Sequence, residues 1–126
     1  MNKEIAKKWV QALRSGKYKQ GREVLHRKEN GKDTYCCLGV LCDLYQQDRR
    51  SKKKKGLAVD NKYDTITYDG FDTVLPCVVL KWAGMETANG MLNYEDMDAN
   101  LVYLNDEKRS SFKTIANVIE KNVENL

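Results

Sequence analysis

The sequence predicts a single α+β domain, in which a small antiparallel sheet packs against about four helices. Three observations carry this prediction. Segments near both ends of the chain repeat apolar residues every three or four positions, as amphipathic helices do. An Asn-Gly pair at positions 30–31 lies between two short extended segments, which is typical of a hairpin turn. The length of 126 residues suits one domain, and no internal repeat indicates a second.

The first part of the chain is predicted to form a helix and a hairpin. Over residues 2–15, Ile5, Trp9 and Leu13 recur every four positions and give the helix one apolar face. Gly16 marks the end of this helix. The segments that follow are a polar connector over 17–23, a strand from 24–25, a turn at 29–32 and a return strand over 34–36.

A second helix is predicted over residues 37–47, where apolar and small residues predominate. Gly39 in this helix costs about 1 kcal/mol relative to Ala, so we expect another backbone to pack closely against it. The basic run that follows, over residues 48–56, is predicted to be a solvated connector.

The second half of the chain is predicted to mix strands, loops and two helices. Residues 57–74 alternate turns with β-formers, and Ile66 and Tyr68 fit the buried side of a strand over 63–68. Pro76 fits the first turn of a short helix that ends at Gly84. The remaining predicted elements are a loop over 85–100, a short strand over 101–104 and a helix over about 110–122.

The composition predicts a soluble globular protein, with 41% hydrophobic and 32% charged residues. The net charge of +4 favours anionic partners without requiring nucleic acid. No apolar run approaches the ~20 residues of a membrane span, and the N-terminal residues lack the apolar stretch of a secretory signal. We therefore expect a cytoplasmic protein whose four cysteines are free thiols, with Cys37 and Cys42 in the core.

None of the standard catalytic motifs is present, so we expect a protein that is not an enzyme and needs no cofactor or metal. The single histidine, His26, precedes Arg and Lys and is predicted to face water rather than to act as a base. Cys36 would be a nucleophile only with a base or a lowered pKa. The acidic residues 95–98 are predicted to lie in a solvated loop.

Binding is better supported than catalysis in the connector over residues 17–23. Arg22 can hold a phosphate, Gln20 can contact a base edge or a sugar hydroxyl, and Tyr18 can stack on a base. Gly16 and Gly21 flank these side chains and let a ligand approach the backbone closely. A surface loop that leaves a helix, with Gly16 as its cap and Gly21 as a turn, is the alternative, and the residue types alone favour it slightly.

Two further segments carry candidate ligand residues, each with a structural alternative. Trp82 suits a packing anchor, and it can also stack on a base, an interaction that contributes roughly 1–3 kcal/mol. Residues 105–109 lead into the last helix, where Arg109 and backbone N–H groups can hold an anion. Ordinary capping by Ser110 or Ser111 is the alternative, although a cation at this position is unfavourable unless an anion joins it.

Several short motifs occur in a specific order over most of the chain. They are L-R-S-G-x-Y-x-Q-G at 13–21, C-C-L-G-V-L-C-D-L at 36–44, L-P to W-A-G over 75–84, and L-N-D at 104–106 with S-F at 111–112. In this order they resemble small proteins of bacteriophages and prophages. Within that group they are similar to the first-described class of Thoeris anti-defence proteins.

The resemblance implies a function. It implies a protein that binds a cyclic ADP-ribose isomer, glycocyclic ADP-ribose, and holds it intact in the cytoplasm of an infected bacterium, so that TIR-dependent immunity is blocked. It also implies a homo-oligomer, dimer or hexamer, and for some members a separate site for cyclic di- or trinucleotides. The ligand-binding residues that it suggests are Tyr18, Gln20, Arg22, Trp82, Asn105 and Arg109.

Two other functions remain open from the sequence. One is a phage accessory protein that binds nucleic acid through the basic residues 49–55, with an affinity that falls steeply with salt. The other is a direct inhibitor of a host protein, for which the sequence carries no specific mark.

Overall fold

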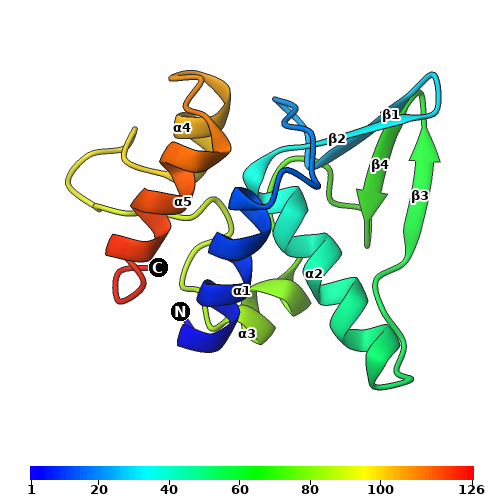
Figure 1. Cartoon of the computed structure of the whole chain (residues 1–126), viewed down its shortest axis with the longest axis horizontal. Coiled ribbons are helices and arrows are strands. Elements are labelled where there is room, and N and C mark those ends of the chain that lie inside the picture. The colour runs from blue at the N-terminus through cyan, green and yellow to red at the C-terminus, as the bar shows by residue number, and fades with distance from the viewer.

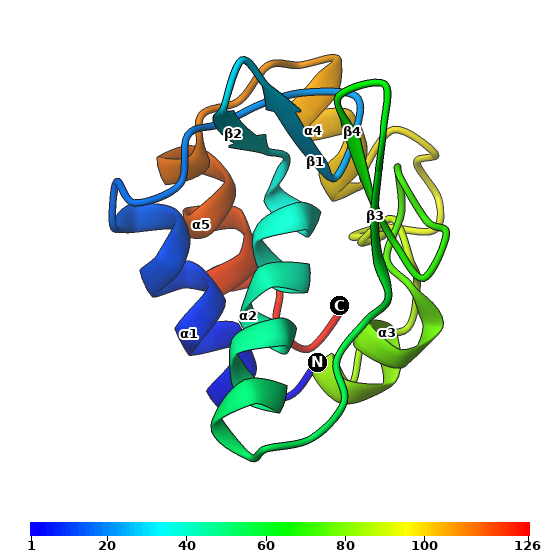
Figure 2. The same ribbon diagram turned by 90° about the vertical axis from the view of Figure 1, so that its right-hand side faces the viewer.

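A long helix, α2 (Cys37–Ser51), lies at the centre of the computed structural model, which describes all 126 residues. Helices α1 (Lys3–Arg14), α3 (Cys77–Ala83) and α4 (Leu101–Asp106) contact α2 directly. The last helix, α5 (Phe112–Lys121), packs against α1 and α4 (Figures 1 and 2). The α+β class and the single small domain predicted from the sequence are confirmed.

The strands form one four-stranded antiparallel sheet made of two hairpins. The strand order is β2-β1-β4-β3, so the hairpins join through β1 and β4, and β3 lies at an edge. The strands are β1 (His26–Glu29), β2 (Lys32–Tyr35), β3 (Val59–Lys62) and β4 (Thr65–Tyr68). The turn predicted at Asn30-Gly31 is confirmed, and both residues have a positive φ.

The core confirms the reason expected for Gly39. A Cβ atom on this residue would lie 2.6 Å from the carbonyl carbon of Leu25 and closer still to its oxygen. The first turn of α2 therefore contacts the backbone that leads into β1, and only glycine leaves room for that contact. Around it, one hydrophobic cluster of 24 buried residues joins all five helices to the sheet.

Local sequence explains where the helices begin and end. Asn2 caps α1 by accepting a hydrogen bond from the Ile5 N–H, and Ser111 caps α5 by accepting one from the Thr114 N–H. Gly84 ends α3 with a φ of 65°, which glycine adopts without cost. The three helices predicted in these places are confirmed.

Three predicted elements are corrected by the structure. Residues 101–104 belong to helix α4 and not to a strand, because Asn100 caps this segment and the helix buries Leu101 against α2. Helix α2 continues to Ser51, into the run predicted as a connector, because Arg49 and Arg50 lie in its last turn, where cations are favourable. Strand β4 begins two residues later than predicted, because Tyr63 and Asp64 form a hairpin turn.

Both chain ends are held against the fold. The Met1 ammonium donates to the Val123 carbonyl at 3.1 Å, and the Glu86 N–H donates to the Leu126 carbonyl at 2.8 Å. None of the helices combines the length and the apolar character needed to cross a bilayer.

Candidate functional site

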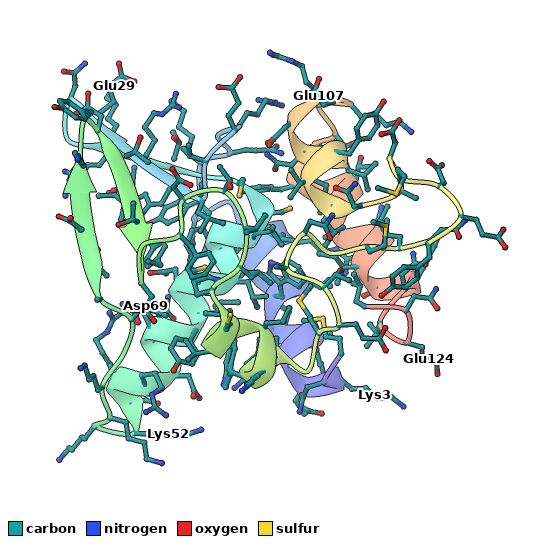
Figure 3. The ribbon with its side chains drawn as sticks, turned by 180° about the vertical axis from the view of Figure 1, so that it is seen from behind. Lys3, Glu29, Lys52, Asp69, Glu107 and Glu124 are labelled. Atoms are coloured by element: carbon teal, nitrogen blue, oxygen red, sulfur yellow. The ribbon has the colours of Figure 1, made fainter.

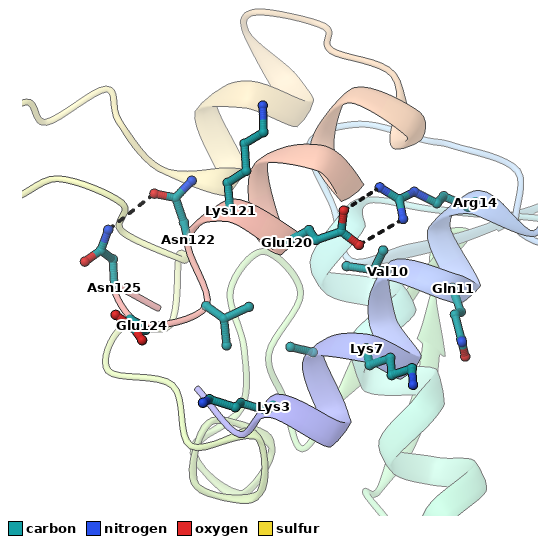
Figure 4. Close-up of a pocket in the computed structure, with 12 residues that line it drawn as sticks. Lys3, Lys7, Val10, Gln11, Arg14, Glu120, Lys121, Asn122, Glu124 and Asn125 are labelled. Atoms are coloured by element: carbon teal, nitrogen blue, oxygen red, sulfur yellow. Dashed lines mark hydrogen bonds and ion pairs between the residues drawn. The ribbon is translucent and has the colours of Figure 1, made fainter.

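A groove of about 590 Å³ lies between α1 and the C-terminal segment (Figure 4), and we call it the α1–α5 groove. Its apolar surface comes from Ala6, Val10 and Val123, and the other side chains along it are charged or carry amides. The lining residues are Lys3, Ala6, Lys7, Val10, Gln11, Arg14, Glu120, Lys121, Asn122, Val123, Glu124 and Asn125.

Charge along the α1–α5 groove is unbalanced in favour of cations, with four cationic and two acidic side chains. Arg14 holds both oxygens of Glu120 at 3.1 and 3.2 Å, and also Asn117 at 2.7 Å. Hydrogen bonding to Arg14 lowers the pKa of the Glu120 carboxyl, so this pair stays ionised and neutral overall. The three lysines form no ion pair. The groove therefore offers an anion the positive charges of Lys3, Lys7 and Lys121.

Helical spacing explains how the sequence places cations along the α1 side of the groove. Lys3, Lys7 and Arg14 are four and seven residues apart, so they lie on one side of α1. The opposite wall follows the end of α5, where Asn122 turns back and donates to the Val118 carbonyl at 2.7 Å. The polar face of α1 was visible in the sequence. Its partner wall was not, because the two walls are more than a hundred residues apart in the chain.

Four of the six predicted ligand residues gather at a different place, which we call the Gln20 corner, where the connector after α1 meets α4 and the start of α5. Gln20 donates to the Asn105 side chain and to the Ser110 carbonyl, both at 2.9 Å, and accepts from the Phe112 N–H at 3.1 Å. Asn105 is fully buried and also bonds the Cys37 N–H at 3.2 Å and the Gly21 carbonyl at 3.0 Å. The hydrogen bonds of these two side chains therefore join the connector after α1 to the start of α2, to α4 and to the start of α5.

The two arginines of the Gln20 corner lie at its surface, each within two residues of the Gln20–Ser110 contact. Arg22 is half-buried, and its Nε is covered without a hydrogen-bond partner. Arg109 is exposed, with a φ of 54°. Ser111 caps α5, so capping accounts for one of the two serines. Among the predicted ligand residues here, the arginines are the ones whose charges remain available.

The other two predicted ligand residues, Tyr18 and Trp82, lie along the second half of α2. The Tyr18 hydroxyl bonds Asp43 and accepts from Gln47 at 3.0 Å, and burial together with Asp43 raises its pKa. Trp82 is half-buried and meets Tyr45 edge-on, with ring centroids 5.4 Å apart. It borders a hollow of about 460 Å³ that also includes Gln47. Trp82 packs against the core as predicted, and it also lines this hollow.

The structure therefore separates residues that were predicted to share one site. Asn105 contacts Cys37 at the start of α2, and Trp82 contacts Tyr45 eight residues later. Because a helix rises 1.5 Å per residue, these contacts are about 12 Å apart along α2. The α1–α5 groove contains none of the six predicted residues.

The prediction that His26 faces water is wrong. Its side chain is buried, because the β1–β2 hairpin stacks it on Tyr35 at 4.1 Å and β4 brings Tyr68 beside it. Both ring nitrogens are bonded at 2.7 Å, one to the Tyr68 hydroxyl and one to the Asp33 carboxylate. His26 thus ties the two hairpins together.

Three of the four cysteines belong to the core, as expected for Cys37 and Cys42. Burial raises the pKa of the Cys36 thiol to about 12 and raises those of Cys37 and Cys42 as well. Neutral thiols are poor nucleophiles, so none of these three is an activated cysteine. Cys77 is exposed at the start of α3.

A comparison with protein-family models identifies the family of this chain. Residues 1–123 match the family model described as a domain of unknown function, DUF8296. The chain belongs to the DUF8296 family. No curated protein and no solved structure matches it. The Gln20 corner and the hollow beside Trp82 lie wholly within the part that matches DUF8296, and only Glu124 and Asn125 of the α1–α5 groove lie outside it.

Proposed function

We propose that this DUF8296 protein is a non-catalytic binding protein that sequesters a cyclic ADP-ribose isomer. The α1–α5 groove carries the proposal, because it combines an apolar surface with three lysines that have no partner in the chain. The resemblance to Thoeris anti-defence proteins supplies the identity of the ligand. The groove supports its chemical class, a small molecule that bears phosphates.

The groove matches such a ligand in charge and size. A cyclic ADP-ribose isomer carries a pyrophosphate with two negative charges, which Lys3, Lys7 and Lys121 can neutralise. Its ribose hydroxyls need donors and acceptors, and the amide of Gln11 provides both, whereas that of Asn122 is already bonded to Val118 and Asn125. A volume of about 590 Å³ lies within the ~300–1,000 Å³ of ordinary small-molecule sites.

Sequestration requires retention of the ligand rather than its turnover. The groove offers cations and amides, and of its two carboxylates Glu120 has both oxygens bound by Arg14, whereas Glu124 has no ion-pair partner. Each site neutralises one ligand molecule, so binding must be tight. A ligand at 100 times its dissociation constant stabilises the folded state by ~2.7 kcal/mol.

The first experiment combines a thermal shift with recovery of the ligand. A saturating cyclic ADP-ribose isomer should raise the Tm by roughly 10 °C, because 1 kcal/mol shifts the Tm of a domain of this size by about 3–6 °C. Heating the complex should then release the cyclic compound unchanged, as chromatography can show. Recovery of a linear product would contradict sequestration. The absence of a shift with every isomer tested would contradict binding.

Charge-reversal variants locate the site. Lys7→Glu and Lys121→Glu should each weaken binding about tenfold or more, because each replaces a cation facing the phosphates by an anion. Lys113→Glu is the matched control, since Lys113 is exposed on α5 and outside the groove. Arg22→Gln and Arg109→Gln should leave the affinity unchanged. If these two variants lose binding while Lys7→Glu retains it, the ligand binds at the Gln20 corner and the groove assignment is wrong.

The basic end of α2 supports one alternative function, binding of nucleic acid. Lys52 to Lys55 are all exposed, and only Lys52 has a carboxylate partner, Asp48 at 3.2 Å. Binding through these lysines would lose affinity steeply between 50 and 200 mM salt, by about one power of salt concentration per phosphate contact. A fluorescence titration with single-stranded and duplex oligonucleotides distinguishes this function from sequestration.

A further inference from the structure

Strand β3 forms an open edge of the sheet, with no element beyond it in either view (Figures 1 and 3). All four of its residues are exposed, and the strand pairs only with β4. An open edge presents backbone N–H and C=O groups to any strand that can align with them.

The hydrogen-bond pattern shows which residues present these groups. The Asp69 N–H donates to the Ala58 carbonyl at 2.8 Å, so residue 58 directs its backbone toward the β4 side. Hydrogen-bonded pairs alternate along an antiparallel ladder, so Asp60 and Lys62 also direct their backbone N–H and C=O groups toward β4. Val59 and Asn61 direct their backbone groups outward.

We propose that this edge is an interaction surface for a second copy of the chain, in which two β3 strands pair antiparallel about Asn61. Asn61 then lies opposite the partner's Asn61, and their outward N–H and C=O groups bond each other. In the same register, Asp60 lies opposite the partner's Lys62. The strand ends at Lys62, so Val59 lies beside the partner's hairpin turn, which begins at Tyr63. Two-fold symmetry makes the pair of Asp60 and Lys62 occur twice.

Charge selects this register. Asp60 and Lys62 are two residues apart, so their side chains lie on one face of the strand. Centring the pairing on Asn61 places each of these charges opposite its counterion. A pairing centred on Val59 satisfies the same backbone alternation but places Asp60 opposite the partner's Ala58, and both ion pairs are lost. Charges on an edge strand usually prevent edge pairing, whereas these two are self-complementary.

Exposed apolar side chains point to the same pairing. Val59 is 55% exposed although it lies beside the buried Tyr68 on β4, so the apolar face of the sheet continues to the edge without a cover. Tyr63 is 91% exposed at the tip of the hairpin. The pairing places the partner's hairpin turn, with its exposed Tyr63, next to Val59.

This inference does not depend on the proposed ligand. Helix α5 lies on the opposite side of the molecule from β3, with α1 and α2 between them (Figure 1), and no residue of β3 lines the α1–α5 groove. Variants of β3 therefore test the pairing without altering the groove, and either proposal can fail while the other stands.

A charge-swap experiment tests the pairing by sedimentation velocity from about 10 μM to 1 mM. The wild type should pass from monomer to dimer as its concentration rises. Asp60→Lys and Lys62→Asp should each weaken association at least tenfold, because like charges then face each other. An equimolar mixture of the two variants should recover association, because their charges complement each other. Lys81→Asp, on the exposed side of α3, is the matched control. A wild type that stays monomeric at 1 mM, or a dimer that neither variant weakens, would overturn the pairing.

Cross-linking tests the register itself. Residues in a hydrogen-bonded antiparallel pair have Cα atoms ~5.5 Å apart, which is within the range of a disulfide. Asn61→Cys in a Cys77→Ser background should therefore form a disulfide-linked dimer under mild oxidation. Lys81→Cys in the same background should remain monomeric. Equal cross-linking at both positions, or none at position 61, would contradict the register, and circular dichroism of each variant confirms that it is folded.

Discussion

Replacement of Gly39 by Ala tests the closest backbone contact in the core. In an open helical site this change would stabilise the protein by about 1 kcal/mol, because Ala has the higher helix propensity. Here the new Cβ would lie 2.6 Å from the Leu25 carbonyl carbon, whereas non-bonded carbons prefer 3.5–4.0 Å. Helix α2 and the segment before β1 would have to separate by more than about 1 Å, because the Leu25 oxygen is closer still. Overpacking of this kind typically costs 1–3 kcal/mol and occasionally more, and both backbones here are fixed by the core.

We therefore expect Gly39→Ala to lower the free energy of unfolding by about 2 kcal/mol, measured by urea denaturation. The Tm should fall by about 6–12 °C. Gly16→Ala is a suitable control, because a Cβ there meets no atom within 4 Å and the φ of 75° alone costs about 1 kcal/mol. If Gly39→Ala matches or exceeds the stability of the wild type, the close contact with Leu25 is refuted.

Three more predictions concern buried groups. Asn105→Ala should lower the free energy of unfolding by about 3 kcal/mol, because it leaves several buried partners without a hydrogen bond. Asn117→Ala at the surface should lower it by less than about 1 kcal/mol, and urea denaturation measures both variants. A thiol reagent at pH 8 should label the exposed Cys77 rapidly and no other cysteine until the protein unfolds. The buried thiols stay protonated and unreactive at this pH, since burial raises the pKa of the Cys36 thiol to about 12. Rapid labelling of a second thiol would contradict this prediction. Burial raises the pKa of Tyr35 from 10.0 to about 12, so the unfolded chain loses this proton at a lower pH than the folded protein does. The free energy of unfolding should therefore fall as the pH rises from about 10 toward 12. The urea midpoint measured over this pH range should fall less steeply in Tyr35→Phe than in the wild type.

Local patterns in the sequence were sufficient for much of the fold. The apolar repeat of α1, the Asn-Gly turn and the Pro76-to-Gly84 helix each depend on residues a few positions apart. Gly39 was also interpretable, since a glycine inside a helix needs a packing reason. In these places the local preference and the tertiary structure agree.

The errors arose where distant residues decide the outcome. The apolar residues of 101–104 suit a strand as well as a helix, and the contact of α4 with α2 selects the helix. His26 lies in a basic segment, yet Tyr68, which is 42 residues away, buries it. The polarity of a neighbouring sequence does not show which side of a strand faces the core.

The candidate site was only partly predictable for the same reason. The sequence singled out Gln20 and Asn105 as ligand residues, and the structure brings them together across 85 positions. Their side chains form hydrogen bonds with other groups of the protein. The groove that offers free cations is lined by Lys121 at the end of α5 and by Lys3 and Lys7 on α1, which no local pattern links.

The central claim is that the α1–α5 groove binds a cyclic ADP-ribose isomer. Amide chemical-shift mapping of the 126-residue protein by two-dimensional NMR tests it most directly, because each backbone N–H reports on its own surroundings. Titration with the isomer should move the signals of residues 3–14 and 120–125 in slow exchange, as tight binding requires. Shifts confined to the Gln20 corner or to the surroundings of Trp82, or none at saturation, would contradict the account.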